Sequence, residues 1–62
     1  MNDFYIVEWK TSNSNKWIED IEEFQTFVGA EAEAIKLKNI TPEDNYRIVK
    51  IIHTKEIITE LK

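Results

Sequence analysis

The sequence predicts a small α+β protein: an antiparallel sheet of three to four strands in the order β-β-α-β-β, with one helix packed on one face. Two segments, "FYIVEWK" and "NYRIVKIIH", are dense in the aromatic and β-branched residues that favour strands. Between them lies a stretch rich in alanine and glutamate, which favours a helix. A chain of 62 residues has room for one core, so we expect 1–62 to form a single domain.

The first strand is expected at residues 4–10, and the "TSNSN" that follows has the side chains that bond their own backbone in turns. Residues 17–24 allow two interpretations. Pairing with the first strand through this short turn would make them the second strand of a hairpin. The alternative is a β-α-β-β order with one long helix over 16–39, because a stripe of 3.6-residue period runs through that segment. Its members are Trp17, Ile21, Phe24, Val28, Ala32 and Ile35.

We favour the strand over the long helix for two reasons. Thr26 is a good N-cap residue and stands where the composition changes from aromatic and β-branched residues to alanine-rich "FVGAEAEAIKLKN". Gly29 would cost about 1 kcal/mol in the middle of a long helix but little in the first turn of a shorter one. The shorter helix is therefore expected to begin just after Thr26.

The helix is expected to stop at "TPED", because a residue that precedes proline avoids the helical conformation. A strand over 45–53 follows, and "EIITEL" would return as a hairpin partner after Thr54 and Lys55. If the helix carries the chain back so that the third strand lies beside the first, the spatial order is 2-1-3-4 and every neighbouring pair is antiparallel. This order puts the two most apolar strands in the centre of the sheet.

Composition excludes several classes of function. The chain has twelve acidic and eight basic residues, a net charge of −4, no cysteine and one histidine, so we expect no metal site and no cofactor. An acidic chain binds a nucleic-acid backbone poorly. No apolar run is long enough for a signal peptide or a membrane span. We expect a cytoplasmic protein that is not bound to a membrane.

The apolar residues of the strands predict an interface. Strand geometry sends neighbouring side chains to opposite faces, and one short helix can cover only one face of such a sheet. Contiguous exposed apolar surface usually marks a contact with another protein, here a different protein or a second copy of the chain in a homodimer. The alternative is that lysine and arginine stems shield a few half-exposed aromatic rings and that no partner is implied.

The residues expected to bind the partner are of two kinds. Four aromatic side chains of the strands would supply apolar contact, and four acidic side chains would either guard an edge strand against unwanted pairing or steer a basic, nucleic-acid-binding protein toward the surface. The aromatic residues are Tyr5, Trp9, Trp17 and Tyr46. The acidic residues are Glu19, Asp20, Glu22 and Glu23.

A second class of function uses the same aromatics as a stacking platform for single-stranded nucleic acid, with Lys10, Lys16, Arg47 and Lys50 beside them. Catalysis has little support, and no residue is expected to be catalytic. His53 is the sole histidine, and its expected neighbour across the last turn, Glu56, would form an ordinary hairpin ion pair. The chain is therefore expected not to be an enzyme.

The order of two strands, an "F-x-T" entry into an Ala/Glu helix and a "YRIVK" strand resembles that of many small proteins of bacteria and their phages. It contains no motif that identifies one family. Our sequence-based hypothesis is a small protein-binding module, an accessory or inhibitory protein of the phage or mobile-element type. It would act through an apolar sheet face and an acidic surface.

Overall fold

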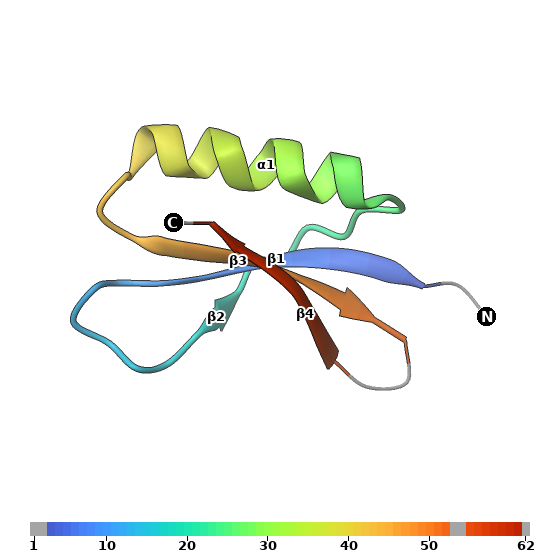
Figure 1. Ribbon diagram of the computed structural model, residues 1–62, viewed down its shortest axis with the longest axis horizontal. Coiled ribbons are helices and arrows are strands. Elements are labelled where there is room, and N and C mark those ends of the chain that lie inside the picture. Colours follow the sequence, from blue (N-terminus) through green and yellow to red (C-terminus); the bar gives the residue numbers. More distant parts are fainter. Residues whose placement is uncertain (1–2, 53–54, 62) are drawn as a thin grey trace.

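The computed structural model describes residues 3–52 and 55–61, and its elements follow the predicted order (Figure 1). They are the strands β1 (Phe4–Lys10) and β2 (Ile18–Glu19), the helix α1 (Phe27–Ile40), and the strands β3 (Asn45–Ile51) and β4 (Lys55–Leu61). The α+β class is confirmed. So is the antiparallel four-stranded sheet with one helix on one face.

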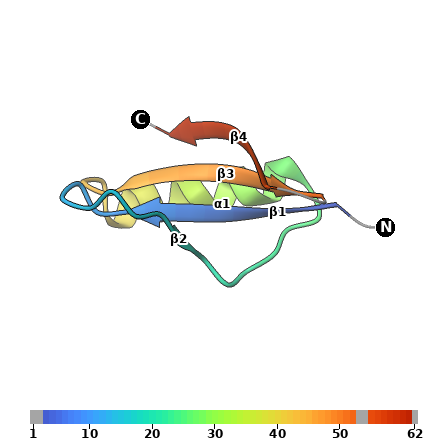
Figure 2. The same cartoon turned by 90° about the horizontal axis from the view of Figure 1, so that it is seen from below.

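The sheet has the order β2-β1-β3-β4, which confirms the predicted topology (Figure 2). β1 and β3 form the centre and are paired along their whole length, from Phe4 opposite Ile51 to Lys10 opposite Asn45. The pairing of β3 with β4 runs from Tyr46 opposite Leu61 to Ile51 opposite Lys55 and has one irregularity between Ile48 and Val49. The two strands cross each other in the view of Figure 1. Residues 53 and 54, where the last predicted turn and His53 lie, are outside the described residues.

The predicted strand over 17–24 forms only in part, and the long-helix alternative is wrong. β2 has two residues, and the backbone N–H of Asp20 then donates to the carbonyl of Val7 at 2.9 Å. The chain next leaves the sheet and returns at Phe24, which exchanges two backbone hydrogen bonds of 2.8 Å with Tyr5. One residue of β1 separates Val7 from Tyr5, whereas three separate Asp20 from Phe24. The segment 21–23 therefore has two residues more than the facing part of β1, and it is excluded from the ladder.

α1 begins where the sequence predicts, because Thr26 is its N-cap and accepts a hydrogen bond from the Gly29 backbone N–H at 3.1 Å. A side chain at Gly29 would approach the Phe24 ring to 3.3 Å, so the glycine lets the segment before the helix pack closely. The helix buries Ala30 and Ala34 against the sheet. Its last turn closes with the Thr41 backbone N–H donating to the carbonyl of Leu37 at 2.9 Å.

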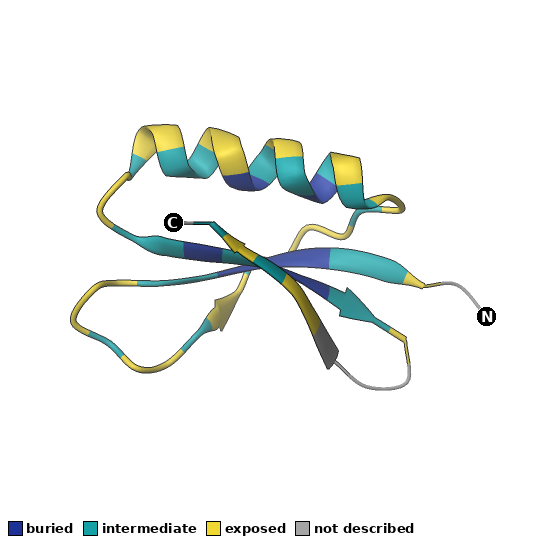
Figure 3. Cartoon of the chain, in the orientation of Figure 1, coloured by how far each residue is buried: buried dark blue, intermediate teal, exposed yellow. Residues whose placement is uncertain are grey.

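The buried positions of the sheet lie in β1 and β3 (Figure 3), and they belong to both faces of the sheet. On the face under α1, Val7, Tyr46 and Ile48 form one cluster with the two helix alanines. On the opposite face, which we call the open face, Ile6 and Val49 are only 5% and 0% exposed although no helix covers them. Neighbouring side chains on the same face shield these central positions.

The large apolar side chains that remain exposed among the described residues are spread over the surface and do not form one sheet face. They lie on β2, on the segment after it, on the outer side of α1 and in the β3–β4 hairpin. The set is Ile18, Ile21, Val28, Ile35, Ile40, Ile52, Ile57 and Ile58. No described helix has the length and apolar character required to cross a membrane.

Candidate functional site

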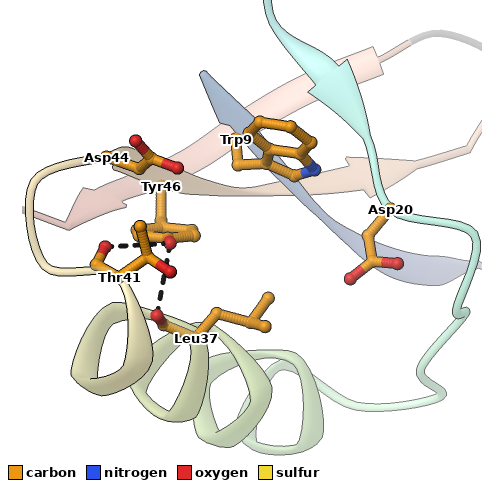
Figure 4. Close-up of a pocket in the computed structure, with 6 residues that line it drawn as sticks. All are labelled: Trp9, Asp20, Leu37, Thr41, Asp44 and Tyr46. Atoms are coloured by element: carbon orange, nitrogen blue, oxygen red, sulfur yellow. Dashed lines mark hydrogen bonds between the residues drawn. The ribbon is translucent and has the colours of Figure 1, made fainter. Parts of the chain in front are cut away.

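A pocket of about 260 Å³ opens where the C-terminal end of α1 meets the sheet (Figure 4). Its lining combines two aromatic rings, two carboxylates, one aliphatic side chain and one threonine. The lining residues are Trp9, Asp20, Leu37, Thr41, Asp44 and Tyr46. They come from β1, from the residue after β2, from the end of α1, from the connection to β3 and from β3 itself.

The two rings of the pocket are brought together by the sheet register. Trp9 of β1 is the direct partner of Tyr46 of β3, so both side chains project from the same face, the one that carries α1. Leu37, in the second half of α1, packs against the core cluster of that same face. In Figure 4 the Trp9 indole and the Leu37 side chain lie on opposite sides of the space, with the Tyr46 ring to the left.

Tyr46 is held rigidly at the inner end of the pocket. Its hydroxyl lies 3.0 Å from the carbonyl oxygen of Thr41 and 3.2 Å from that of Leu37, and the residue is 4% exposed. Burial raises the pKa of the Tyr46 phenol above its ordinary value. Contact with the Thr41 side chain lowers this pKa, and the negative charges of Asp44 and Glu43 raise it.

The two carboxylates of the pocket are half-buried and come from distant parts of the chain. Figure 4 shows Asp20 and Asp44 on opposite sides of the Trp9 indole. One oxygen of Asp20 accepts a hydrogen bond from the Ile21 backbone N–H at 2.8 Å. The nearby Lys38 ammonium donates to backbone carbonyls, those of Pro42 at 3.3 Å and Asp44 at 3.4 Å.

Three of the eight predicted partner-binding residues meet in this pocket: Trp9, Asp20 and Tyr46. The other two aromatics lie elsewhere. Tyr5 is on the helix side, where its ring packs edge-on against Phe27 with centroids 6.2 Å apart. Trp17 stacks with the Arg47 guanidinium, 4.1 Å from its ring centroid. Because Arg47 follows Tyr46 in an extended strand, its side chain points to the open face.

Three of the four predicted aromatics, Tyr5, Trp9 and Tyr46, thus lie on the helix side of the sheet, whereas Trp17 lies on the open face. The remaining acidic residues, Glu19, Glu22 and Glu23, are exposed on β2 and on the segment that leaves the sheet after it. Sequence reasoning missed Leu37, Thr41 and Asp44. The "TPED" stretch was recognised only as the end of the helix, and nothing local in it indicates that Asp44 lines the same pocket as Asp20.

The chemistry of the pocket suits a positively charged group. Aromatic faces attract cations within about 6 Å of the ring centroid, and carboxylates form the strong, charge-assisted hydrogen bonds with them. No group of three or more metal-ligating side chains occurs among the residues that the structure describes. No protein-family model, no curated protein and no solved structure matches the chain.

Proposed function

We propose that this chain is a small non-enzymatic protein-binding module that recognises a basic protein through the acidic surface around the pocket. The observation that carries the proposal is the pocket itself, in which Trp9 and Tyr46 stand between Asp20 and Asp44. Rigid aromatic side chains with charged neighbours are characteristic of the residues that dominate binding energy in protein interfaces. The pocket would therefore offer a partner apolar groups at its centre and acidic groups at its rim.

Charge around the pocket supports a basic partner. Glu22, Glu23 and Glu43 are exposed and add negative charge to the segments that contribute Asp20 and Asp44. Such a surface accelerates the encounter with a positively charged protein and opposes the binding of anions. A nucleic acid is thus disfavoured as the direct ligand, whereas a nucleic-acid-binding protein has the complementary charge. An accessory or inhibitory role toward such a protein fits this surface.

A second contact area is offered by the β3–β4 hairpin. Ile52, Ile57 and Ile58 are 39%, 50% and 40% exposed, and β4 is the last strand of the sheet. An edge strand with apolar side chains favours contact with another chain. This area is the part of the predicted apolar surface to which a protein partner or a second copy of the chain would bind.

The test compares the chain with the variant Glu22→Lys/Glu23→Lys as bait in affinity capture from the source cell. Both positions are exposed, so the variant should keep the fold, which circular dichroism checks. We expect a basic protein that binds the chain directly, as purified components, and whose affinity for the variant is at least tenfold lower. The matched control is Lys36→Glu on the helix surface, which should retain the partner. Equal affinity of the partner for the parent chain and for Glu22→Lys/Glu23→Lys would contradict the proposal.

Fluorescence anisotropy with a labelled single-stranded oligonucleotide tests the nucleic-acid alternative. Binding of a nucleic acid weakens steeply as salt rises, because counterions are released on binding. We expect no binding near physiological salt. Salt-sensitive oligonucleotide binding that Trp9→Ala abolishes would favour the alternative over the protein-binding module. Light scattering of the chain alone measures whether it forms a homodimer.

A further inference from the structure

We propose that the pocket receives an arginine side chain of the protein partner, so that the guanidinium stacks on Trp9 and pairs with Asp20 and Asp44. This inference rests on the proposed function and names the group that the module recognises. The charge of the pocket, its shape and an arrangement of the same kind elsewhere in the chain point to this ligand.

Three sources of negative potential converge on the pocket. Two are the carboxylates of Asp20 and Asp44. The third is the C-terminal end of α1, which contributes Leu37 and Thr41 to the lining and carries the negative pole of the helix dipole. The Lys38 ammonium, which donates to the carbonyls of Pro42 and Asp44, offsets part of this potential. The lining itself holds two carboxylates and no basic side chain, so it favours a cation.

The shape of the pocket selects among cations. Trp9 lies across the space from Leu37 (Figure 4), which gives one aromatic and one aliphatic wall with a carboxylate on either side of the indole. A planar guanidinium can stack on an aromatic face while its N–H groups reach carboxylates in its plane. An ammonium is compact and strongly hydrated, so it gains less from two apolar walls. The geometry therefore fits arginine better than lysine.

The chain already builds this kind of arrangement on its open face. There the Arg47 guanidinium lies 2.6 Å from the Glu8 carboxylate and 4.1 Å from the ring centroid of Trp17. On the helix side, Trp9 and the two aspartates supply the same aromatic and acidic groups. The Lys38 ammonium nearby donates to the carbonyls of Pro42 and Asp44. On this side of the sheet the guanidinium would come from another chain.

The test is an NMR titration of the ¹⁵N-labelled chain with N-acetyl-arginine amide. The two indole N–H signals are built-in reporters, because Trp9 lines the pocket and Trp17 lies on the open face. We expect saturable shifts of the Trp9 indole and of the Asp20 and Asp44 amides, with a dissociation constant on the order of 1 to 10 mM, as suits so small a ligand. The chemical shift of the Trp17 indole N–H should not change.

Matched ligands and variants decide the chemistry. The citrulline analogue has the same shape without the charge and should cause no saturable shift, and the lysine analogue should bind about threefold or more weakly. Asp20→Asn keeps an acceptor for the Ile21 N–H and should weaken binding about three- to tenfold, as should Asp44→Asn. The control Glu31→Gln removes one charge in the first half of α1, outside the lining, and should change the affinity less than twofold.

Several results would overturn the proposal. They are equal shifts with citrulline, equal affinity for lysine, shifts centred on Trp17, or affinity unchanged by both aspartate substitutions. The outcome is separable from that of the proposed function. If the arginine analogue does not bind while Glu22→Lys/Glu23→Lys still loses a basic partner, the module stands and the pocket assignment fails. If the analogue binds and no basic partner is found, the proposed function fails instead.

Discussion

The Arg47 guanidinium lies 2.6 Å from the carboxylate of Glu8, and that carboxylate is buried in the open face of the sheet with 1% exposure. The two residues are cross-strand partners in β1 and β3. In the same register Glu19 stands beside Glu8 and Glu60 beside Arg47. One arginine therefore lies in a row with three acidic residues, and the Trp17 ring stacks with it.

Replacing Arg47 by methionine should lower the free energy of unfolding by about 3–5 kcal/mol, because a buried carboxylate then loses its cationic partner. This loss is comparable to the whole stability of many small domains. Urea denaturation followed by circular dichroism measures it. The Lys10 ammonium lies 5.2 Å from the Trp17 ring centroid. The control Lys10→Met should lower the free energy of unfolding by less than about 1 kcal/mol.

The double variant Glu8→Leu/Arg47→Met provides the complementary test. Removing both charges leaves no buried carboxylate without its arginine, so most of the stability lost in Arg47→Met should return. If Arg47→Met alone is as stable as the parent chain, the ion pair contributes nothing and this account is wrong.

Ile48 lies at the centre of the core under α1 and is fully buried. Ile48→Ala should lower the free energy of unfolding by about 2–5 kcal/mol through lost burial and the cavity left behind. Ile21→Ala is the matched control, because Ile21 is 97% exposed and its truncation should change stability by less than about 0.5 kcal/mol. Equal effects of the two substitutions in chemical denaturation would contradict the described packing.

Thr26 caps the first turn of α1, where its hydroxyl oxygen accepts the Gly29 N–H. Thr26→Ala should cost about 1 kcal/mol of stability, since that N–H loses its partner. Thr26→Ser keeps the acceptor and should remain within a few tenths of a kcal/mol of the parent chain. Thermal unfolding of the three proteins checks this order, and a destabilised serine variant would argue against the cap.

The Tyr46 phenol should ionise above its ordinary pKa, mainly because it is buried. Folding then favours its protonated form, so its contribution to stability is complete below the unfolded pKa near 10 and falls as pH rises through the folded pKa. The ultraviolet absorbance of tyrosinate measures the ionisation as pH is raised. Tyr46→Phe should remove the absorbance change that occurs at the highest pH. Assignment of that transition to Tyr5, through loss in Tyr5→Phe, would refute the prediction.

A stability comparison of the parent chain and Tyr46→Phe at neutral pH isolates the hydroxyl. Loss of its hydrogen bonding to Thr41 and Leu37 should cost about 1 kcal/mol. The difference should shrink above pH 10, where the parent chain loses the contribution of the protonated phenol.

The sequence by itself determined the elements whose signals are local. β1 follows from a dense run of strand-forming residues, and the start of α1 follows from a capping side chain three residues ahead of the Gly29 N–H that it binds. The order of the strands could also be predicted, because only one arrangement makes all neighbours antiparallel with the apolar strands at the centre. These properties depend on backbone preferences and on the alternation of side chains.

The tertiary structure alone decided what depends on contacts between distant residues. Asp20 and Phe24 bond to Val7 and Tyr5 of β1, which are separated by one residue. Three residues separate Asp20 from Phe24, so residues 21–23 must leave the sheet. Burial of Glu8 and the presence of both Asp20 and Asp44 in one pocket likewise depend on register and on where α1 ends. Local composition does not predict these contacts, because each is set by pairing and packing between segments far apart in the chain.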